Sequence, residues 1–239
     1  MSRQLVIIPT YNEKENVENV IGVTLSLQSE FDILIVDDGS PDGTADIVKK
    51  IIETQSRVNI LERQGKLGLG TAYLTGFKWA LKNKYDYIFE MDADLSHNPH
   101  DLEKLLDALK DGNDVAIGSR YITGVNVVNW PMGRVLLSYC ASMYVRKVTG
   151  MDVRDATAGF VGYSRSFLYS LDMKRIEMVG YGFQIEMKYT AWRLGFKIKE
   201  VPIIFTDRTL GTSKMSGGIF GEAFWKVLML RFRTIKRRK

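Results

Sequence analysis

The chain has 239 residues, 45% of them hydrophobic, and a formal net charge of +5. This composition allows one sizeable core and excludes a disordered protein. A single cysteine, Cys140, excludes a disulfide framework or thiolate-rich metal site, and two nearby histidines, His97 and His100, argue against a histidine zinc site. The charge is uneven, because residues 231–239 hold six Lys or Arg and no acid, leaving 27 basic and 28 acidic residues before them.

The sequence gives no sign of a secretory signal or a membrane span. The first apolar run, residues 5–8, is too short for a signal core, and no run of eighteen apolar residues exists. The longest uncharged apolar stretch, residues 135–145, suits a core or interfacial helix. We therefore expect a protein that faces the cytosol and is either soluble or lies on a membrane.

Short apolar runs alternate with helical patterns along the first half of the chain. This alternation is typical of an α/β fold with a mostly parallel sheet between helices, which binds ligands at the carboxyl ends of its strands. In the second half, Pro202 places the last strand at a sheet edge, and residues 209–218 form a loop rich in Gly, Ser and Thr. The predicted strands are 5–8, 33–36, 58–61, 87–91, 115–118, 158–163 and 198–205, and the predicted helices are 15–27, 44–53, 70–81, 102–109, 132–149, 183–194 and 219–235.

Acidic residues follow two of the predicted strands. Asp37 and Asp38 end the second strand, and Asp92 and Asp94 follow the fourth. Two carboxylates one residue apart can face one cation, and carboxylate, water and phosphate oxygens are ligands that Mg²⁺ or Mn²⁺ prefers. The pair is common in loops by chance, but its position after an apolar strand favours a metal that clamps a diphosphate.

The segment that closes the first strand, residues 9–13 (PTYNE), has two interpretations. Tyr11 could pack on a nucleobase while Glu13 accepts hydrogen bonds from a base or ribose. Alternatively, the segment is a simple turn in which Thr10 or Asn12 caps the next helix. No G-x-G-x-x-G follows this strand and no P-loop motif occurs, which disfavours dinucleotide binding and P-loop chemistry.

Several segments, taken in order, resemble the family 2 inverting glycosyltransferases with a GT-A (Rossmann-like) fold, and within them the dolichyl (polyprenyl) phosphate mannosyltransferases. The resemblance covers roughly residues 4–230. It is carried by residues 9–13 (PTYNE), 36–40 (VDDGS), 65–70 (GKLGLG), 92–97 (DADLSH), 118–121 (GSRY), 155–160 (DATAGF), 180–186 (GYGFQIE), 205–208 (FTDR) and 211–214 (GTSK).

The resemblance implies a role for individual residues. Family members often carry Gln at the position of Ser96, where it is a further metal ligand. The serine side chain is shorter, so the resemblance does not imply that Ser96 binds the metal, and a water molecule can take that ligand position. Asp92 and Asp94 would bind Mg²⁺ or Mn²⁺, with Asp94 also counted as catalytic. The nucleotide-sugar donor would be held by Pro9, Tyr11, Glu13, Val36, Asp38, Asp92, Ala93, Asp94 and Lys214. The acceptor phosphate would be surrounded by Arg120, Arg134, Ser138 and Arg208, of which Arg120 and Arg208 are also counted as catalytic.

The implied reaction moves mannose from GDP-mannose to a polyprenyl phosphate with inversion. The acceptor phosphate is already an anion, so no strong general base is needed, and arginines with a metal offset the repulsion between the two anionic substrates. Nothing in the spacing separates GDP from UDP, and a UDP-glucose-dependent or other hexose transferase with the same acceptor remains the alternative. The absence of a Gly-rich basic loop in residues 4–13 disfavours a nucleotidyltransferase. A membrane-bound scaffold subunit is the alternative that is not an enzyme.

A polyprenyl acceptor requires contact with a bilayer. We predict a catalytic domain over residues 1–218 and an amphipathic, interfacial helix with a basic tail over residues 219–239. Its apolar face is rich in Phe and Trp, and Glu222, Lys226, Arg233, Lys236 and Arg237 fall on the opposite face, whereas Arg231 points to the apolar side. These features favour a peripheral protein at the cytoplasmic face of an anionic membrane, anchored by itself or by a partner. Basic residues gathered in a tail argue against nucleic-acid binding.

Overall fold

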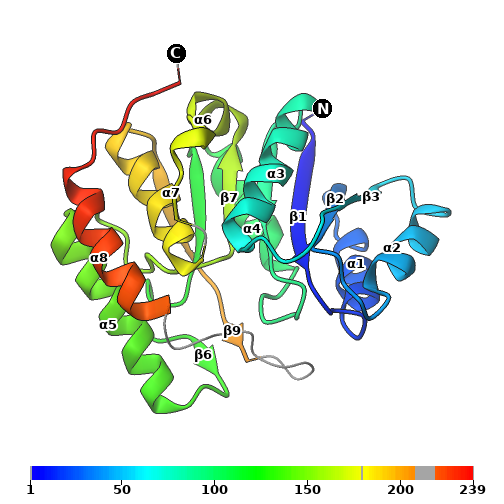
Figure 1. Cartoon of the computed structure of the whole chain (residues 1–239), viewed down its shortest axis with the longest axis horizontal. Coiled ribbons are helices and arrows are strands. Elements are labelled where there is room, and N and C mark those ends of the chain that lie inside the picture. The colour runs from blue at the N-terminus through cyan, green and yellow to red at the C-terminus, as the bar shows by residue number, and fades with distance from the viewer. Residues whose placement is uncertain (1, 179, 208–218, 239) are drawn as a thin grey trace.

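A seven-stranded sheet organises the chain in the computed structural model, which describes residues 2–178, 180–207 and 219–238 (Figure 1). The strands lie in the order β3-β2-β1-β4-β7-β5-β8, with β7 antiparallel to β4 and β5 and the other neighbouring pairs parallel. The mostly parallel sheet and the edge position of β8 are therefore confirmed. The strands are β1 (Gln4–Thr10), β2 (Phe31–Asp37), β3 (Val58–Glu62), β4 (Tyr87–Glu90), β5 (Val115–Ser119), β7 (Val161–Ser164) and β8 (Ile198–Pro202).

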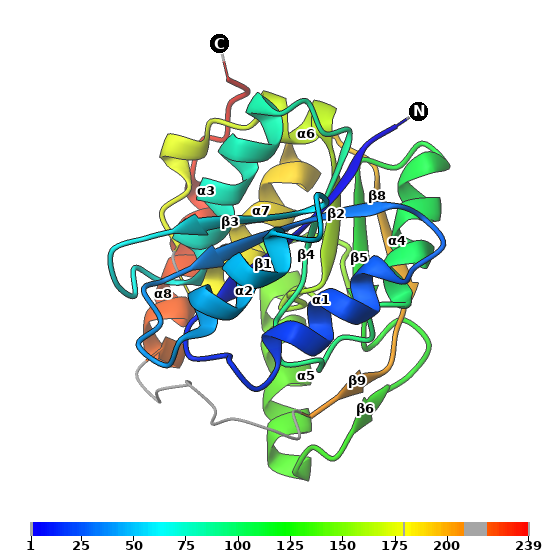
Figure 2. The ribbon, with the colours of Figure 1, turned by 90° about the vertical axis from the view of Figure 1, so that its right-hand side faces the viewer.

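Helices cover both faces of this sheet, and Figure 2 views the layers from the side. Successive strand residues face opposite sides, so Leu5 and Ile7 of β1 pack in one core layer while Val6 and Ile8 pack in the other. The layer that contains Val6 is closed by α1 (Val17–Leu25), α2 (Thr44–Ile52) and α4 (Asp101–Lys110). The layer that contains Leu5 is closed by α3 (Leu69–Lys82), α5 (Met132–Thr149), α6 (Arg165–Ser170), α7 (Tyr181–Arg193) and α8 (Ile219–Phe232).

The segments that carry polar side chains lie where the carboxyl ends of β1 to β4 meet; we call this end of the sheet, which is not an outer strand, the sheet edge. Strands β1 to β4 are mutually parallel, so Thr10, Asp37 and Glu90 end at the same edge. Strand β7 starts there, because Val161 pairs with Glu90, and the loop before it reaches the same place. A small parallel sheet of β6 (Val127–Val128) and β9 (Phe205–Thr206) lies beyond this edge, toward the bottom of Figure 1.

The second half of the chain departs from the sequence predictions. The strand predicted over 158–163 starts at Val161, and the strand predicted over 198–205 is divided between β8 in the main sheet and β9 in the small one. Short elements were not predicted, because two to six residues show no periodicity; these are β6, α6 and a 3₁₀ turn over Met173–Arg175. The loop predicted over 209–218 lies outside the described residues.

Helix α8 differs from the predicted amphipathic helix. It ends at Phe232 rather than residue 235, so Lys236 and Arg237 are not on it. Val227 and Leu230 are buried, whereas Trp225 and Phe232 are 64% and 78% exposed, so apolar side chains face both the protein and the outside. The prediction of one apolar and one basic face is wrong for this described part, because the helix must cover the core beside α5 and α7. No helix among the described residues is long and apolar enough to cross a membrane.

The basic tail contacts the body of the protein. Arg231 donates from Nη1 to the Val148 carbonyl at 2.6 Å, and Arg237 donates from Nη2 to the Leu194 carbonyl at 3.1 Å. Both carbonyls lie at the C-terminal ends of helices, where a cation is favourable. Arg233, predicted to face away from the protein, forms an ion pair with the buried Glu186. In this structure these arginines stabilise the tail against the protein.

Candidate active site

The end of β2 is held to β1 by Asp37. This carboxylate is 1% exposed and accepts hydrogen bonds from Thr10 Oγ1 at 2.8 Å and from Ser40 N and Oγ at 2.9 and 2.6 Å. Thr10 is therefore not a helix cap, and neither is Asn12, because the residue before α1 is Asn16. The capping alternative for residues 9–13 is wrong, and Asp37 joins the ends of β1 and β2 through its hydrogen bonds.

The residues predicted to hold the nucleoside lie around this strand end. Tyr11 and Glu13 are half-buried, and Lys66 Nζ lies 5.4 Å from the centre of the Tyr11 ring. Glu13 Oε2 accepts a hydrogen bond from Asn16 at 2.9 Å. The side chain of Val36 is fully buried in the core, and Pro9 is partly buried on β1. The structure thus brings these residues to one edge, while their contact with a nucleoside stays a prediction.

Asp38 has a partner that sequence reasoning missed. Arg63, just after β3, places Nη2 2.5 Å from Asp38 Oδ1 and also donates to Thr71 Oγ1 at 2.9 Å. Gly39 has φ of +69°, a conformation that favours glycine, and a Cβ there would lie 3.2 Å from the Gly65 nitrogen. The loop after β2 and the glycine-rich segment before α3 therefore pack as one unit. One sequence signal could have indicated this partner: Arg63 follows the third predicted strand, and Asp38 follows the second, which is its neighbour in the sheet.

The two aspartates of the D-x-D segment follow β4. The Asp92 side chain is 40% exposed, and Asp94 Oδ1 accepts a hydrogen bond from the Ser96 nitrogen at 3.1 Å. Leu95 between them and Ser96 adopts φ of +58°, which marks a tight turn. Burial is the main cause of the raised pKa of Tyr73, and the charges of both carboxylates raise it further.

The D-x-D segment fits a metal that is shared with a substrate phosphate. No group of three or more His, Cys, Asp or Glu side chains among the described residues is placed to hold a metal alone. Two carboxylates suffice for Mg²⁺, which usually keeps water and substrate phosphate oxygens as its other ligands. Ser96 Oγ is buried and has no hydrogen-bond partner in the described structure, so a hydroxyl oxygen next to Asp94 is not committed elsewhere.

His97 is a packing residue rather than a proton-transfer group. Its ring stacks on Phe160 at 5.0 Å between centroids and meets the Phe205 ring edge-on at 5.2 Å. Burial lowers the pKa of His97 to about 4, so the imidazole is neutral at neutral pH. Its position ties the turn after Asp94 to β9.

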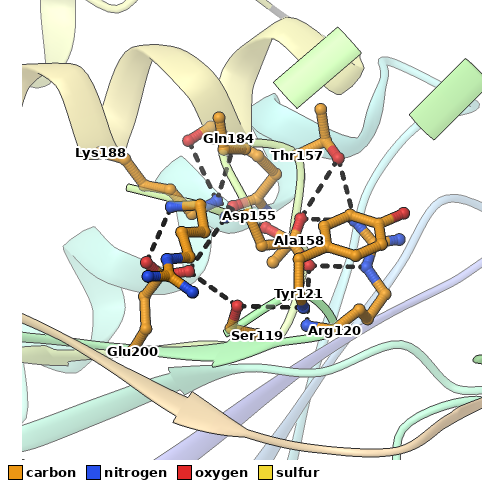
Figure 3. A network of polar contacts seen from close by, with 11 residues as sticks. Ser119, Arg120, Tyr121, Asp155, Thr157, Ala158, Gln184, Lys188 and Glu200 are labelled. Atoms are coloured by element: carbon orange, nitrogen blue, oxygen red, sulfur yellow. Dashed lines mark hydrogen bonds and ion pairs between the residues drawn. The ribbon is translucent and has the colours of Figure 1, made fainter. Parts of the chain in front are cut away.

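Arg120 is oriented by the loop before β7 (Figure 3). Asp155 accepts hydrogen bonds from Arg120 N, Nε and Nη2 at 2.9, 2.7 and 2.6 Å, and Thr157 Oγ1 accepts from Nη2 at 2.9 Å. Arg120 is 8% exposed and Asp155 is fully buried. Burial alone would raise the pKa of Asp155, but the Arg120 charge and hydrogen bonds overcome it and lower that pKa.

Arg134, at the start of α5, lies on the same side as Arg120. Its Nη1 donates to Asp207 at 2.9 Å, and its guanidinium sits 4.1 Å from the Trp130 ring centroid. Arg120 lies 5.4 Å from the centroid of the same ring, so both cations contact Trp130. Ser138 lies beside the Tyr121 hydroxyl. The other two predicted cations, Arg208 and Lys214, lie outside the described residues.

Comparison with known proteins identifies the class. The family model described as "Glycosyl transferase family 2" matches residues 5–171. The fold is similar to that of glucosyl-3-phosphoglycerate synthase from Mycobacterium tuberculosis, with a TM-score of 0.68, 20% identity and coverage of 96% of this chain and 78% of that one. That synthase has also been solved in complex with Mn²⁺, uridine diphosphate and glucosyl-3-phosphoglycerate. The chain belongs to glycosyl transferase family 2.

Two relatives that are 47% identical to this chain carry more specific names. The polyprenol monophosphomannose synthase of Mycolicibacterium smegmatis is 47% identical over 94% of this chain and 85% of its own length. The undecaprenyl-phosphate mannosyltransferase of Micrococcus luteus is 47% identical over 92% of this chain and 90% of its own length. The resemblance predicted from the ordered segments is therefore confirmed.

Proposed function

We propose that this chain transfers mannose from GDP-mannose to a polyprenyl phosphate and inverts the configuration at the sugar carbon. The observation that carries the proposal is the placement of an exposed carboxylate, Asp92, and two oriented arginines, Arg120 and Arg134, at one edge of the sheet. The names of the two relatives that are 47% identical support the same substrates. The carboxylate of Asp92 suits a metal-bound diphosphate, and the two arginines suit an anionic acceptor.

The chain's own residues supply positioning and charge. Arg120 and Arg134 hold the acceptor phosphate, whose oxygen forms the new bond to the anomeric carbon. The bond from that carbon to the nucleoside diphosphate breaks, and the diphosphate leaves with the electron pair, so no proton transfer is needed. Asp92 and Asp94 would hold Mg²⁺ or Mn²⁺, which supplies positive charge to the leaving diphosphate. The residues around Tyr11 and Asp38 would bind the nucleoside.

The direct test is transfer from radiolabelled donors to undecaprenyl phosphate in detergent with Mg²⁺ or Mn²⁺. Mannose transfer from GDP-mannose is the expected result, and glucose transfer from UDP-glucose alone would establish the alternative donor instead. Asp94→Asn is expected to lower kcat/KM by about a hundredfold or more. The substitution weakens metal binding, so the positive charge that stabilises the leaving diphosphate is lost. A scaffold subunit would keep its function in this variant, and Asp107→Asn, at an exposed position of α4, is the matched control.

The proposal includes a peripheral position on the cytoplasmic face of the membrane. Helices α5 and α8 pack together, at the lower left of Figure 1, and both leave large apolar side chains exposed. A surface of this kind suits insertion at the headgroup boundary, close to where Arg134 begins α5. The exposed side chains are Met132, Leu136, Leu137 and Met143 on α5 and Trp225, Leu228, Met229 and Phe232 on α8.

A further inference from the structure

The loop that orients Arg120 is itself held from two sides by charged side chains (Figure 3). From β8, Glu200 accepts hydrogen bonds from the backbone nitrogens of Arg154 and Asp155 at 2.7 and 2.9 Å and from Ser119 Oγ at 2.7 Å. From α7, Lys188 Nζ donates to the carbonyls of Ala158 at 2.6 Å and Ala156 at 3.3 Å. Neither side chain was singled out by the sequence, because both contacts join distant segments.

Lys188 is an unusual core residue. It has no exposed surface, and its third hydrogen bond goes to the Gln184 carbonyl of its own helix at 3.3 Å. A buried ammonium is costly unless its donors have acceptors. Here its three donors meet three carbonyls, which is the pattern of the charged form. The arrangement stabilises one backbone path for residues 156–158, which includes the Thr157 hydroxyl that accepts from Arg120.

We propose that Lys188 is a positioning residue for the acceptor phosphate: it fixes the 155–158 loop so that Asp155 and Thr157 hold the Arg120 guanidinium in its binding orientation. The inference rests on the proposed function, since it takes Arg120 as the acceptor-binding group. Lys188 touches neither substrate. Its effect is expected in acceptor binding, whereas the nucleotide site around Asp38 and Arg63 is built on other strands.

The charged groups around Lys188 define a pH response. Asp155 from the loop, Glu90 from β4 and Glu200 from β8 favour the ammonium, while Arg120 opposes it. Burial is the largest influence and lowers the pKa of Lys188 to about 8. As the pH rises through this value the ammonium loses a proton, so two N–H donors remain for the three carbonyls and the charge that strengthens the hydrogen bonds to the loop is lost. The wild-type KM for polyprenyl phosphate should therefore rise above about pH 8.

The test compares wild-type protein with Lys188→Met and with the exposed control Lys104→Met. Lys188→Met is expected to raise the KM for undecaprenyl phosphate by about tenfold or more, with the Kd for GDP within about twofold of wild type. It should also abolish the rise of that KM between about pH 7 and about pH 9.5. Lys104→Met should match wild type in all three measurements, because the Lys104 side chain is 59% exposed.

Each remaining outcome also decides the question. An unchanged acceptor KM in folded Lys188→Met, or equal losses of acceptor and GDP affinity, overturns the inference while wild-type mannose transfer still supports the proposed function. If Lys188→Met does not fold, the wild-type pH profile decides: a rise in acceptor KM near pH 8 without a change in GDP affinity supports the inference, and a flat profile overturns it. Absence of mannose transfer by the wild type overturns the proposed function itself.

Discussion

Arg63 and Asp38 form an ion pair in which both side chains are only 9% exposed. The same guanidinium donates to Thr71 on α3, so one cation joins the end of β2 to the segment that starts the next helix. A buried charge that loses its partner is destabilising, because its desolvation is no longer compensated. Arg63 therefore fixes the shape of the predicted nucleoside site as well as its charge.

Substitution Arg63→Met is expected to weaken GDP binding by about tenfold or more and to lower the free energy of unfolding by about 3–5 kcal/mol. Calorimetric titration with GDP and urea denaturation measure the two effects. The matched control is Lys49→Met, which breaks an ion pair to Glu62 whose side chains are 48% and 49% exposed, so its stability should stay close to that of the wild type. Unchanged GDP affinity in the folded Arg63 variant would contradict the assignment.

Asp155 gives a prediction on the acid side. Its pKa is lower in the folded protein than the ordinary value of 3.8, so its contribution to stability is present at neutral pH and is lost as the pH falls below that value. Asp155→Asn should be less stable than wild type by about 3–5 kcal/mol at pH 7, because Arg120 is left without its partner. Urea denaturation at neutral pH and near pH 3 checks this, and the difference should shrink at the lower pH. An equal difference at both pH values would show that the carboxylate charge is not responsible.

Two glycines allow a matched test of the core. A Cβ on Gly162 of β7 would lie 2.6 Å from Phe89 Cε1, whereas a Cβ on Gly22 of α1 meets nothing within 4 Å. Gly162→Ala is expected to lower the free energy of unfolding by about 1–3 kcal/mol through overpacking. Gly22→Ala is expected to raise it by about 0.5–1 kcal/mol, because alanine favours the helix. Thermal and urea unfolding distinguish the two, and similar effects of both changes would refute the packing argument.

The proposed membrane surface predicts a loss of vesicle binding. Replacing Trp225 and Phe232 of α8 by serine should reduce co-sedimentation with phosphatidylcholine–phosphatidylglycerol vesicles by about tenfold or more, because each exposed ring contributes about 1.5–3 kcal/mol when buried. Tyr169→Ser is the control, since this residue is 66% exposed and belongs to α6, a helix that Figure 1 shows away from α5 and α8; its ring contacts Arg238 of the tail, which lies beyond the end of α8. Equal losses in both variants would contradict a specific membrane face.

Local pattern predicted the elements well where a long periodicity exists. Helix α5 spans Met132–Thr149 as expected, and the first five strands lie where their apolar runs do. One strand was predicted over 198–205, whereas the structure has two. The separation of β8 from β9 depends on pairing with β5 and β6, which lie far away in the sequence. Local spacing carries no information about such partners.

The same limit applies to the candidate site. The resemblance selected Asp38, Arg120 and Arg134, and the structure places them at one sheet edge. It assigned no role to the groups that hold them, although Asp155 and Asp207 lie in segments that carry the resemblance, because a side chain's partner depends on tertiary contact rather than on motif spacing. Those groups are Arg63, Asp155, Lys188, Glu200 and Asp207.

The course of the chain from β8 into β9 has a consequence for substrate size. Glu200 braces the loop that holds Arg120, and seven residues later Asp207 pairs with Arg134, with extended backbone in β8 and β9. The gap between the two guanidinium groups is thus set partly by main-chain length, which side-chain repacking does not alter. Inserting one residue between β8 and β9 would displace one cation relative to the other by up to about 3.3 Å. This is longer than a typical donor–acceptor distance, so the two guanidinium groups could no longer both bind a single phosphate head group.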